Sequence, residues 1–321
     1  MQLLFLERPR FAKLKRGMKM NEIHAVNFAP FPSRGVLAQP QTRLSLEAMA
    51  KETEANWVIL CPGALQRNAH SEQIVWQGDG TPEDAELLAA IRHAQSLGLK
   101  VALKPTVNCL DGTWRAHIGF FDWDIPGEPN WGNWFAAYTA FQLHYAKLAE
   151  QSGCEMLITG CEMVQAEHRE TEWRALLAAV RGEYAGAVSY NTDKYCENHV
   201  AWWDAVDVIS ASGYYPTGSW QAQLDRIETV VKQYNKPFFF AECGCMNIRG
   251  SEKAPNNWEL QGVCDDAAQA VWYGEMFAAC RERSWFGGYG IWDWPADTAH
   301  PSAYAISGRP ALRVVADAFR R

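Results

Sequence analysis

Two stretches decide the fold expected for this chain, Ile158-Thr159-Gly160-Cys161-Glu162 and Pro237-Phe238-Phe239-Phe240-Ala241-Glu242. Each is a short apolar run typical of a buried strand, and each ends in a glutamate. In a barrel of alternating strands and helices, side chains at the carboxyl ends of the strands share one mouth, where active sites are built. Glu162 and Glu242 are therefore predicted to face each other across such a mouth.

Similar apolar runs recur along the whole chain and alternate with helical patterns. The expected strands are 24–28, 57–61, 100–105, 155–159, 187–191, 206–210, 237–242 and 288–292. This alternation indicates βα units and a parallel sheet. Eight units within 321 residues fit a closed barrel better than an open sheet, and no Gly-x-Gly-x-x-Gly follows the first strand. The predicted fold is α/β, a single (β/α)8 TIM barrel.

The barrel is expected to be the catalytic domain and to occupy residues 23–321. Residues 1–22 are interpreted as an N-terminal extension, loosely ordered. Their apolar stretch is short and is followed at once by charges, unlike a signal peptide, so we expect a cytoplasmic protein. Nowhere does an apolar run approach the length that crosses a bilayer, which argues against a membrane partner.

Composition narrows the possible partners. The chain has 30 Lys and Arg against 37 Asp and Glu, a net charge of −7, without a long basic run, which argues against nucleic acid. Fifteen tryptophans offer flat rings that either stack on sugars or pack the core. Nine cysteines without a compact spacing are expected to be free buried thiols. Cys243-Gly244-Cys245 is not a usual zinc spacing, so we expect neither a metal nor a cofactor.

Two carboxylates across a barrel mouth suit the hydrolysis of a glycosidic bond. In retaining glycosidases one carboxylate is the nucleophile and the other is the acid/base. The acid must be kept partly neutral near neutral pH, which an apolar wall or a second carboxylate achieves. Either Glu162 or Glu242 alone could form a salt bridge at the barrel rim. The pair, at the fourth and seventh strands, favours catalysis.

Several short motifs resemble one known family. They are Glu54-Ala55-Asn56-Trp57-Val58, Leu103-Lys104-Pro105, Trp114-Arg115, Gly160-Cys161-Glu162-Met163, Trp202-Trp203-Asp204-Ala205-Val206-Asp207, Tyr214-Tyr215-Pro216, Lys236-Pro237, Ala241-Glu242-Cys243-Gly244 and Trp292-Asp293-Trp294. In this order and spacing they resemble glycoside hydrolase family 113, the β-mannanases of clan A. The resemblance runs from about Ala25 to the last helix.

The resemblance implies cleavage of β-1,4-mannosidic bonds, in mannan or manno-oligosaccharides, by double displacement. Glu242 would attack the anomeric carbon, and Glu162 would protonate the departing oxygen and later deprotonate water. Most of the clan has asparagine directly before the acid/base, where its amide contacts the sugar 2-hydroxyl. Cys161, a poorer hydrogen-bond donor, stands there in this chain.

Substrate-binding residues are expected around the two carboxylates. They are Lys104, Trp114, Arg115, Cys161, Asn191, Tyr214, Tyr215, Trp292 and Trp294. By the resemblance, Trp292 forms an aromatic floor beneath the sugar at the cleavage point. Either Tyr214 or Tyr215 would donate a hydrogen bond to the nucleophile and keep it ionised.

Two other functions stay open. The same machinery could act on a β-glucoside or a β-xyloside, or the barrel could bind sugar without cleaving it. Carboxylates much farther apart than the roughly 5–5.5 Å of retaining enzymes would favour the non-catalytic barrel.

Overall fold

The structure of the protein is a computed structural model that describes residues 22–320. The extension expected at residues 1–22 lies outside the described residues, apart from Glu22. The barrel strands are β1 (Ile23–Phe28), β2 (Trp57–Leu60), β4 (Lys100–Leu103), β6 (Met156–Cys161), β7 (Ala187–Thr192), β8 (Val208–Ser212), β9 (Phe238–Cys243) and β10 (Phe286–Trp294). They close in the order β1-β10-β9-β8-β7-β6-β4-β2, and neighbouring strands run parallel.

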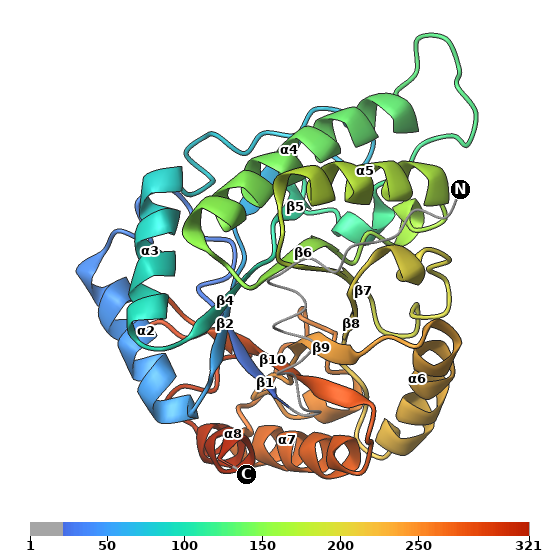
Figure 1. Ribbon diagram of the computed structural model, residues 1–321. Helices are drawn as coiled ribbons and strands as arrows, with labels where there is room; N and C mark the ends of the chain where they lie inside the picture. Colours follow the sequence, from blue (N-terminus) through green and yellow to red (C-terminus); the bar gives the residue numbers. More distant parts are fainter. Residues whose placement is uncertain (1–21, 321) are drawn as a thin grey trace.

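Helices surround this barrel, as the view down its axis shows (Figure 1). They are α2 (Pro40–Thr53), α3 (Asp84–Ser96), α4 (Trp131–Ser152), α5 (Glu170–Glu183), α6 (Trp220–Tyr234), α7 (Asp266–Arg281) and α8 (Pro310–Phe319). The expected (β/α)8 barrel is confirmed. Among the described residues, none of the helices combines the length and the apolar character needed to cross a membrane.

Four elements differ from the sequence-based expectation. Between β7 and β8 the described chain forms only the short 3-10 helix η3 (Trp203–Ala205), so this unit lacks a full α-helix. Helix α7, which sequence analysis did not place, begins where the Asp265 side chain accepts a hydrogen bond from the Ala268 N–H at 3.0 Å. Strands β3 (Gly63–Gln66) and β5 (Thr106–Cys109) were also missed, and they pair as a separate parallel sheet.

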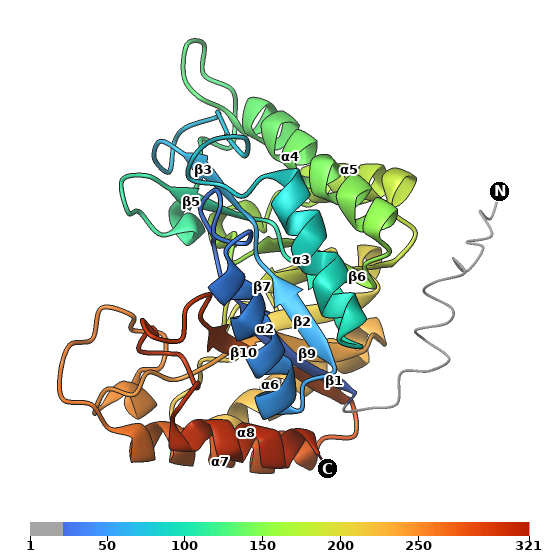
Figure 2. The same cartoon turned by 90° about the vertical axis from the view of Figure 1, so that its left-hand side faces the viewer.

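The small sheet helps to build the mouth of the barrel. β3 follows β2 after two residues and β5 follows β4 after two, so both continue past the carboxyl ends of barrel strands. In the side view the small sheet and the loop between β9 and α7 lie on the same side of the barrel (Figure 2). Loops of this end shape the site, as is usual for barrels of this type.

Two apolar layers hold the barrel together. Inside it, Phe239 and Ala241 pack with residues of the other strands, whereas Phe238 and Phe240 of the same strand face the helices. This alternation is the two-residue period of a strand. It explains why the apolar run before Glu242 is continuous, since both faces of the strand are buried.

An irregularity near the end of β6 aims its last side chains. The pairing of β6 with β7 shifts register between Ile158 and Cys161, as in a β-bulge. Gly160 lies in this shift with φ 154°, and a Cβ on it would stand 2.6 Å from Tyr138 Oη. A residue without a side chain is therefore required there, and the shift turns Cys161 toward the barrel interior, beside Glu242.

Candidate active site

A cavity of about 300 Å³ lies at the carboxyl ends of β6 and β9. Both predicted catalytic glutamates line it. So do four of the predicted substrate-binding residues: Trp114, Arg115, Tyr214 and Trp292. The cavity is thus the shared mouth that the sequence predicted.

The two glutamates lie close together within it. An oxygen of Glu162, an oxygen of Glu242 and the Sγ of Cys161 are all within 4.8 Å of one another. Retaining glycosidases hold their carboxyl groups about 5–5.5 Å apart, and inverting ones about 6.5–9.5 Å apart to fit a water molecule. The spacing therefore suits direct attack by one carboxylate.

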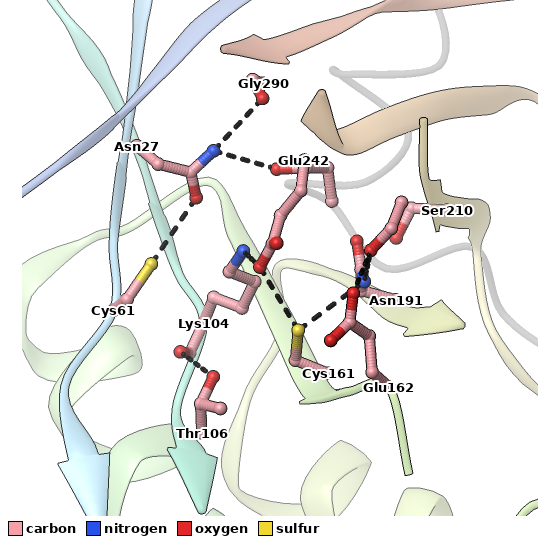
Figure 3. A network of polar contacts seen from close by, with 12 residues as sticks. Asn27, Cys61, Lys104, Thr106, Cys161, Glu162, Asn191, Ser210, Glu242 and Gly290 are labelled. Carbon is pink, nitrogen blue, oxygen red and sulfur yellow. Dashed lines mark hydrogen bonds and ion pairs between the residues drawn. The ribbon is translucent and has the colours of Figure 1, made fainter. Parts of the chain in front are cut away.

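Glu242 accepts hydrogen bonds on both of its oxygens, and Figure 3 shows the contacts with Lys104 and Cys161. Lys104 Nζ forms a buried ion pair with Oε1, which also accepts the Cys161 thiol at 3.2 Å. Tyr214 Oη donates to Oε2 at 3.0 Å. Burial opposes ionisation of Glu242, but the charges of Lys104 and Arg115 and these hydrogen bonds outweigh it. The pKa of Glu242 consequently lies below its ordinary value, as a nucleophile requires.

Glu162 lies on the other side of the mouth with different partners. Its Oε1 accepts from Ser212 Oγ at 2.7 Å, and its Oε2 accepts from Trp114 Nε1 at 3.1 Å and Arg115 Nη1 at 3.0 Å. Its backbone has a positive φ of 54°, in the left-handed region that residues with side chains seldom adopt. The three hydrogen bonds from Ser212, Trp114 and Arg115 hold the carboxylate in place.

A third carboxylate, Asp193, also lines the cavity. Burial and the nearby negative charge of Glu162 raise the pKa of Asp193 to about 7, although the neighbouring Lys194 opposes this. Asp193 follows β7 directly. Its position at the end of a strand could have indicated a site residue, but the sequence-based prediction did not include it.

Cys161, Glu162 and Glu242 together have the donor atoms of a metal site, but their surroundings fit one poorly. The cations of Lys104 and Arg115 each contact one of the carboxylates. Burial and the two carboxylates raise the pKa of the Cys161 thiol well above its ordinary value, which disfavours the thiolate that a metal needs. The cluster is better suited to a carboxylate nucleophile.

Five predicted substrate-binding residues do not line the cavity. Lys104, Cys161 and Asn191 are fully buried beneath it. Lys104 and Cys161 contact Glu242 itself, and Asn191 Nδ2 donates to Ser212 Oγ at 3.0 Å, so they support the carboxylates from below. Direct contact between these three residues and the sugar stays a prediction.

Tyr215 and Trp294 lie elsewhere. The Tyr215 hydroxyl donates to Glu197, because its side chain points away from that of Tyr214 and packs on Trp220. Trp294 is buried, and its Nε1 donates to Ser45 Oγ of α2 at 3.0 Å. Of the two tyrosines, Tyr214 is therefore the one that reaches Glu242.

Several site residues were missed because only tertiary structure brings them together. Asn256, Trp258 and Tyr304 reach the cavity from long segments after β9 and β10. Asn27 of β1 acts from below, since its Nδ2 donates to the carbonyl oxygens of Ala241 at 2.9 Å and Gly290 at 3.1 Å (Figure 3). It fixes the backbone immediately before Glu242, and no local motif indicated this role.

The ion pair between Lys104 and Glu242 leads to a prediction about how activity depends on pH. Lys104→Met removes the charge that most lowers the pKa of Glu242, so Glu242 protonates at higher pH. The acid limb of kcat/KM is then expected to move to higher pH, with a loss at pH 5 of about tenfold or more, because a protonated carboxyl is no nucleophile. Profiles of kcat/KM against pH for both proteins measure this.

Lys100→Met is the matched control, since exposed Lys100 lies at the start of the same strand over the Trp57 ring. Its profile should follow the wild type. An unmoved acid limb in Lys104→Met would contradict the assigned role of Lys104.

The chain is similar to members of one known family. Residues 26–307 match the family model for Glycoside Hydrolase Family 113. A solved structure described as a complex of a GH113 β-1,4-mannanase is 50% identical, with a TM-score of 0.92, and the match covers 94% of this chain and 99% of that chain. The GH113 β-mannanase AaManA from Alicyclobacillus acidocaldarius, in complex with ManMIm, is 38% identical, with a TM-score of 0.90 and coverage of 94% and 98%.

More remote matches show the fold alone. A β-glucuronidase from Ruminococcus gnavus is 12% identical, with a TM-score of 0.60, and the match covers 92% of this chain and 50% of that one. No curated protein matches the sequence. The family model spans most of the chain, and two family members share at least 38% of the aligned residues. The chain belongs to glycoside hydrolase family 113.

Proposed function

We propose that this enzyme hydrolyses β-1,4-mannosidic bonds, in mannan or manno-oligosaccharides, with retention of configuration. The observation that carries the proposal is the pair of glutamate oxygens within 4.8 Å, one on each side of the mouth. The match to a GH113 β-1,4-mannanase at 50% identity supports mannose as the sugar.

In the first step Glu242 is the nucleophile. Two donors, Lys104 and Cys161, contact its Oε1, whereas among the described residues only Tyr214 contacts its Oε2. Oε2 is therefore the less hindered oxygen, and it forms the bond to the anomeric carbon while the glycosidic bond breaks. Glu162 gives its proton to the departing oxygen. Trp292, which lines the cavity and lies 5.0 Å from Lys104 Nζ, offers its ring to the apolar face of the sugar beside Glu242.

The second step reverses these roles. Water attacks the anomeric carbon, Glu162 takes its proton, and the bond between that carbon and Glu242 breaks. Lys104 and Tyr214 stabilise the carboxylate that is released. Two displacements at one carbon restore the original configuration.

The test follows wild-type cleavage of mannohexaose by proton NMR. Under the proposal the new reducing ends appear first as the β-anomer and mutarotate afterwards. Product lengths over time distinguish endo from exo action. The α-anomer appearing first would contradict the mechanism.

A folded enzyme that leaves mannohexaose intact would contradict the choice of sugar. A panel of aryl β-glucosides, β-xylosides and β-mannosides then distinguishes two alternatives. One is a glycosidase that acts on β-glucosides or β-xylosides, and the other is a barrel that binds sugar without cleaving it. Cleavage of a glucoside or xyloside alone supports the former, and binding without any cleavage supports the latter.

A further inference from the structure

A second cavity lies beside the active site and has no part in the proposed mechanism. Its volume is about 470 Å³. The segment between β5 and α4, which projects past the start of α4 (Figure 2), forms most of it, and His70, Gln165 and His168 complete its walls. Among the described residues, this cavity and the catalytic one share no lining residue. It is therefore a separate cavity and not an arm of the catalytic one.

The two cavities meet at a contact between two rings. Trp114 lines the catalytic cavity and His117 lines the second one, and the centroids of their rings are 5.8 Å apart with an angle of 82° between the planes. Gln165, which also lines the second cavity, follows Glu162 by three residues. A sugar chain that is longer than the catalytic cavity can therefore continue into the second one.

Two exposed aromatic rings stand together at the second cavity. Phe121 lines it and is 54% exposed, and Trp123 is 69% exposed. The ring centroids are 6.3 Å apart with an angle of 33° between the planes, so the two rings form one gently tilted surface. Single exposed apolar side chains are common on proteins, but adjoining ones that are rimmed by polar groups mark binding surfaces.

Polar contacts keep this surface in shape. Asp122, which lies between the two rings in sequence, has its Oδ1 2.8 Å from His168 Nε2, and its carbonyl oxygen accepts from Arg169 Nη1 at 3.3 Å. His70 Nδ1 lies 2.7 Å from the Gly119 carbonyl oxygen. These contacts tie the segment to the loops that follow β3 and β6. A surface that is already ordered costs less free energy to use than one that must order on binding.

The chemistry of the surface favours a neutral sugar chain. The two rings match the apolar C–H face of a pyranose. The Glu128 carboxylate and the Gln165 amide both line the cavity, and they offer hydrogen-bond acceptors and donors to hydroxyl groups. The carboxylates of Asp122 and Glu128 would repel an anionic ligand.

We propose that Phe121 and Trp123, together with the cavity beside them, bind mannose units of a polymeric β-mannan that extend beyond the catalytic cavity. This inference rests on the proposed function. Units bound here lie away from the reacting atoms, so their contacts are equally strong in the ground state and in the transition state. Losing such contacts raises KM on the polymer and leaves kcat unchanged. Substrates that are too short to reach the surface are unaffected.

The experiment compares a sparsely substituted galactomannan with β-mannobiosyl fluoride, a short substrate that releases fluoride ion. Trp123→Ala is expected to raise KM on galactomannan about fivefold, as for loss of one aromatic contact, with kcat and the rate on the fluoride unchanged. Trp123→Phe should recover part of the loss. Leu44→Ala is the matched control, since Leu44 is 64% exposed on α2 and lines neither cavity, and its KM should equal the wild-type value.

Binding without hydrolysis is measured in the Glu242→Gln background, by retardation in a native gel that contains galactomannan. Trp123→Ala should weaken this retardation, whereas Leu44→Ala should not.

A KM on galactomannan that is unchanged in Trp123→Ala would overturn the inference. So would equal losses on galactomannan and on the fluoride, which would indicate damage to the fold, or retardation by xylan in place of galactomannan. Failure of the proposed function looks different, because the wild type would then cleave neither galactomannan, nor mannohexaose, nor the fluoride, and the inference would fall with it.

Discussion

Glu242→Gln is expected to lower kcat on mannohexaose by about 10⁴-fold or more, the loss typical of removing a catalytic nucleophile. The amide keeps the size of the side chain and an oxygen that can accept from Lys104, but it cannot form the covalent intermediate. Initial rates and thermal unfolding of the same preparation test activity and folding together.

Glu167→Gln is the control for this substitution. Glu167 lies five residues after Glu162, and its Oε1 accepts hydrogen bonds from Tyr190 and Thr192. Burial raises the pKa of Glu167 to about 8 despite these bonds, so at pH 7 the substitution replaces a mostly neutral group. It is expected to retain most activity. Equal losses in both variants would contradict the special role of Glu242.

A substitution of Glu242 by a smaller residue tests from which face of the sugar ring Glu242 attacks. Glu242→Ala leaves space for azide, which can attack the anomeric carbon of β-mannobiosyl fluoride from the position of the lost carboxylate. One displacement inverts the configuration, so the expected product is the α-azide. A β-azide would contradict the assignment of Glu242 as nucleophile.

The barrel was predictable because its signal is local. Each strand buried on both faces appears as a short apolar run, as in the stretch that ends at Glu242. β3 and β5 were missed because each directly follows a barrel strand and looks like its continuation or a loop. Helix α7 was missed because its start at Asp265 follows a long segment without periodicity.

The site was predictable only at the ends of the strands. Glu162 and Glu242 are each placed by the strand that precedes them, whereas Trp258 and Tyr304 reach the cavity through loops with no sequence pattern. Whether a strand residue points into the barrel or toward the helices depends on the register of its strand. The shift in β6 that turns Cys161 inward could not be seen in the sequence. The cytoplasmic location expected from the sequence stays a prediction.

Glu162→Ala is expected to affect substrates according to their leaving groups. A sugar departs as an alkoxide and needs a proton, so kcat/KM on mannohexaose should fall by about 10²–10⁴-fold, the usual contribution of general acid catalysis. Fluoride departs without a proton, so the first step on β-mannobiosyl fluoride should be far less affected. The second step still needs a base. The variant should therefore release about one equivalent of fluoride rapidly and then turn over slowly, which stopped-flow measurements of fluoride release would detect.

Azide separates this variant from its counterpart at Glu242. As an anion it needs no base, so it should attack the accumulated intermediate, accelerate turnover and give the β-azide by a second displacement. Ser212→Ala is a suitable comparison, because it removes one hydrogen bond to Glu162 Oε1 while the carboxyl group remains. It should show neither the burst nor the rescue. Equal losses of activity of Glu162→Ala on mannohexaose and on the fluoride, without rescue by azide, would contradict the acid/base role. Only the loss of a group that transfers protons makes the defect depend on the leaving group and on the nucleophile.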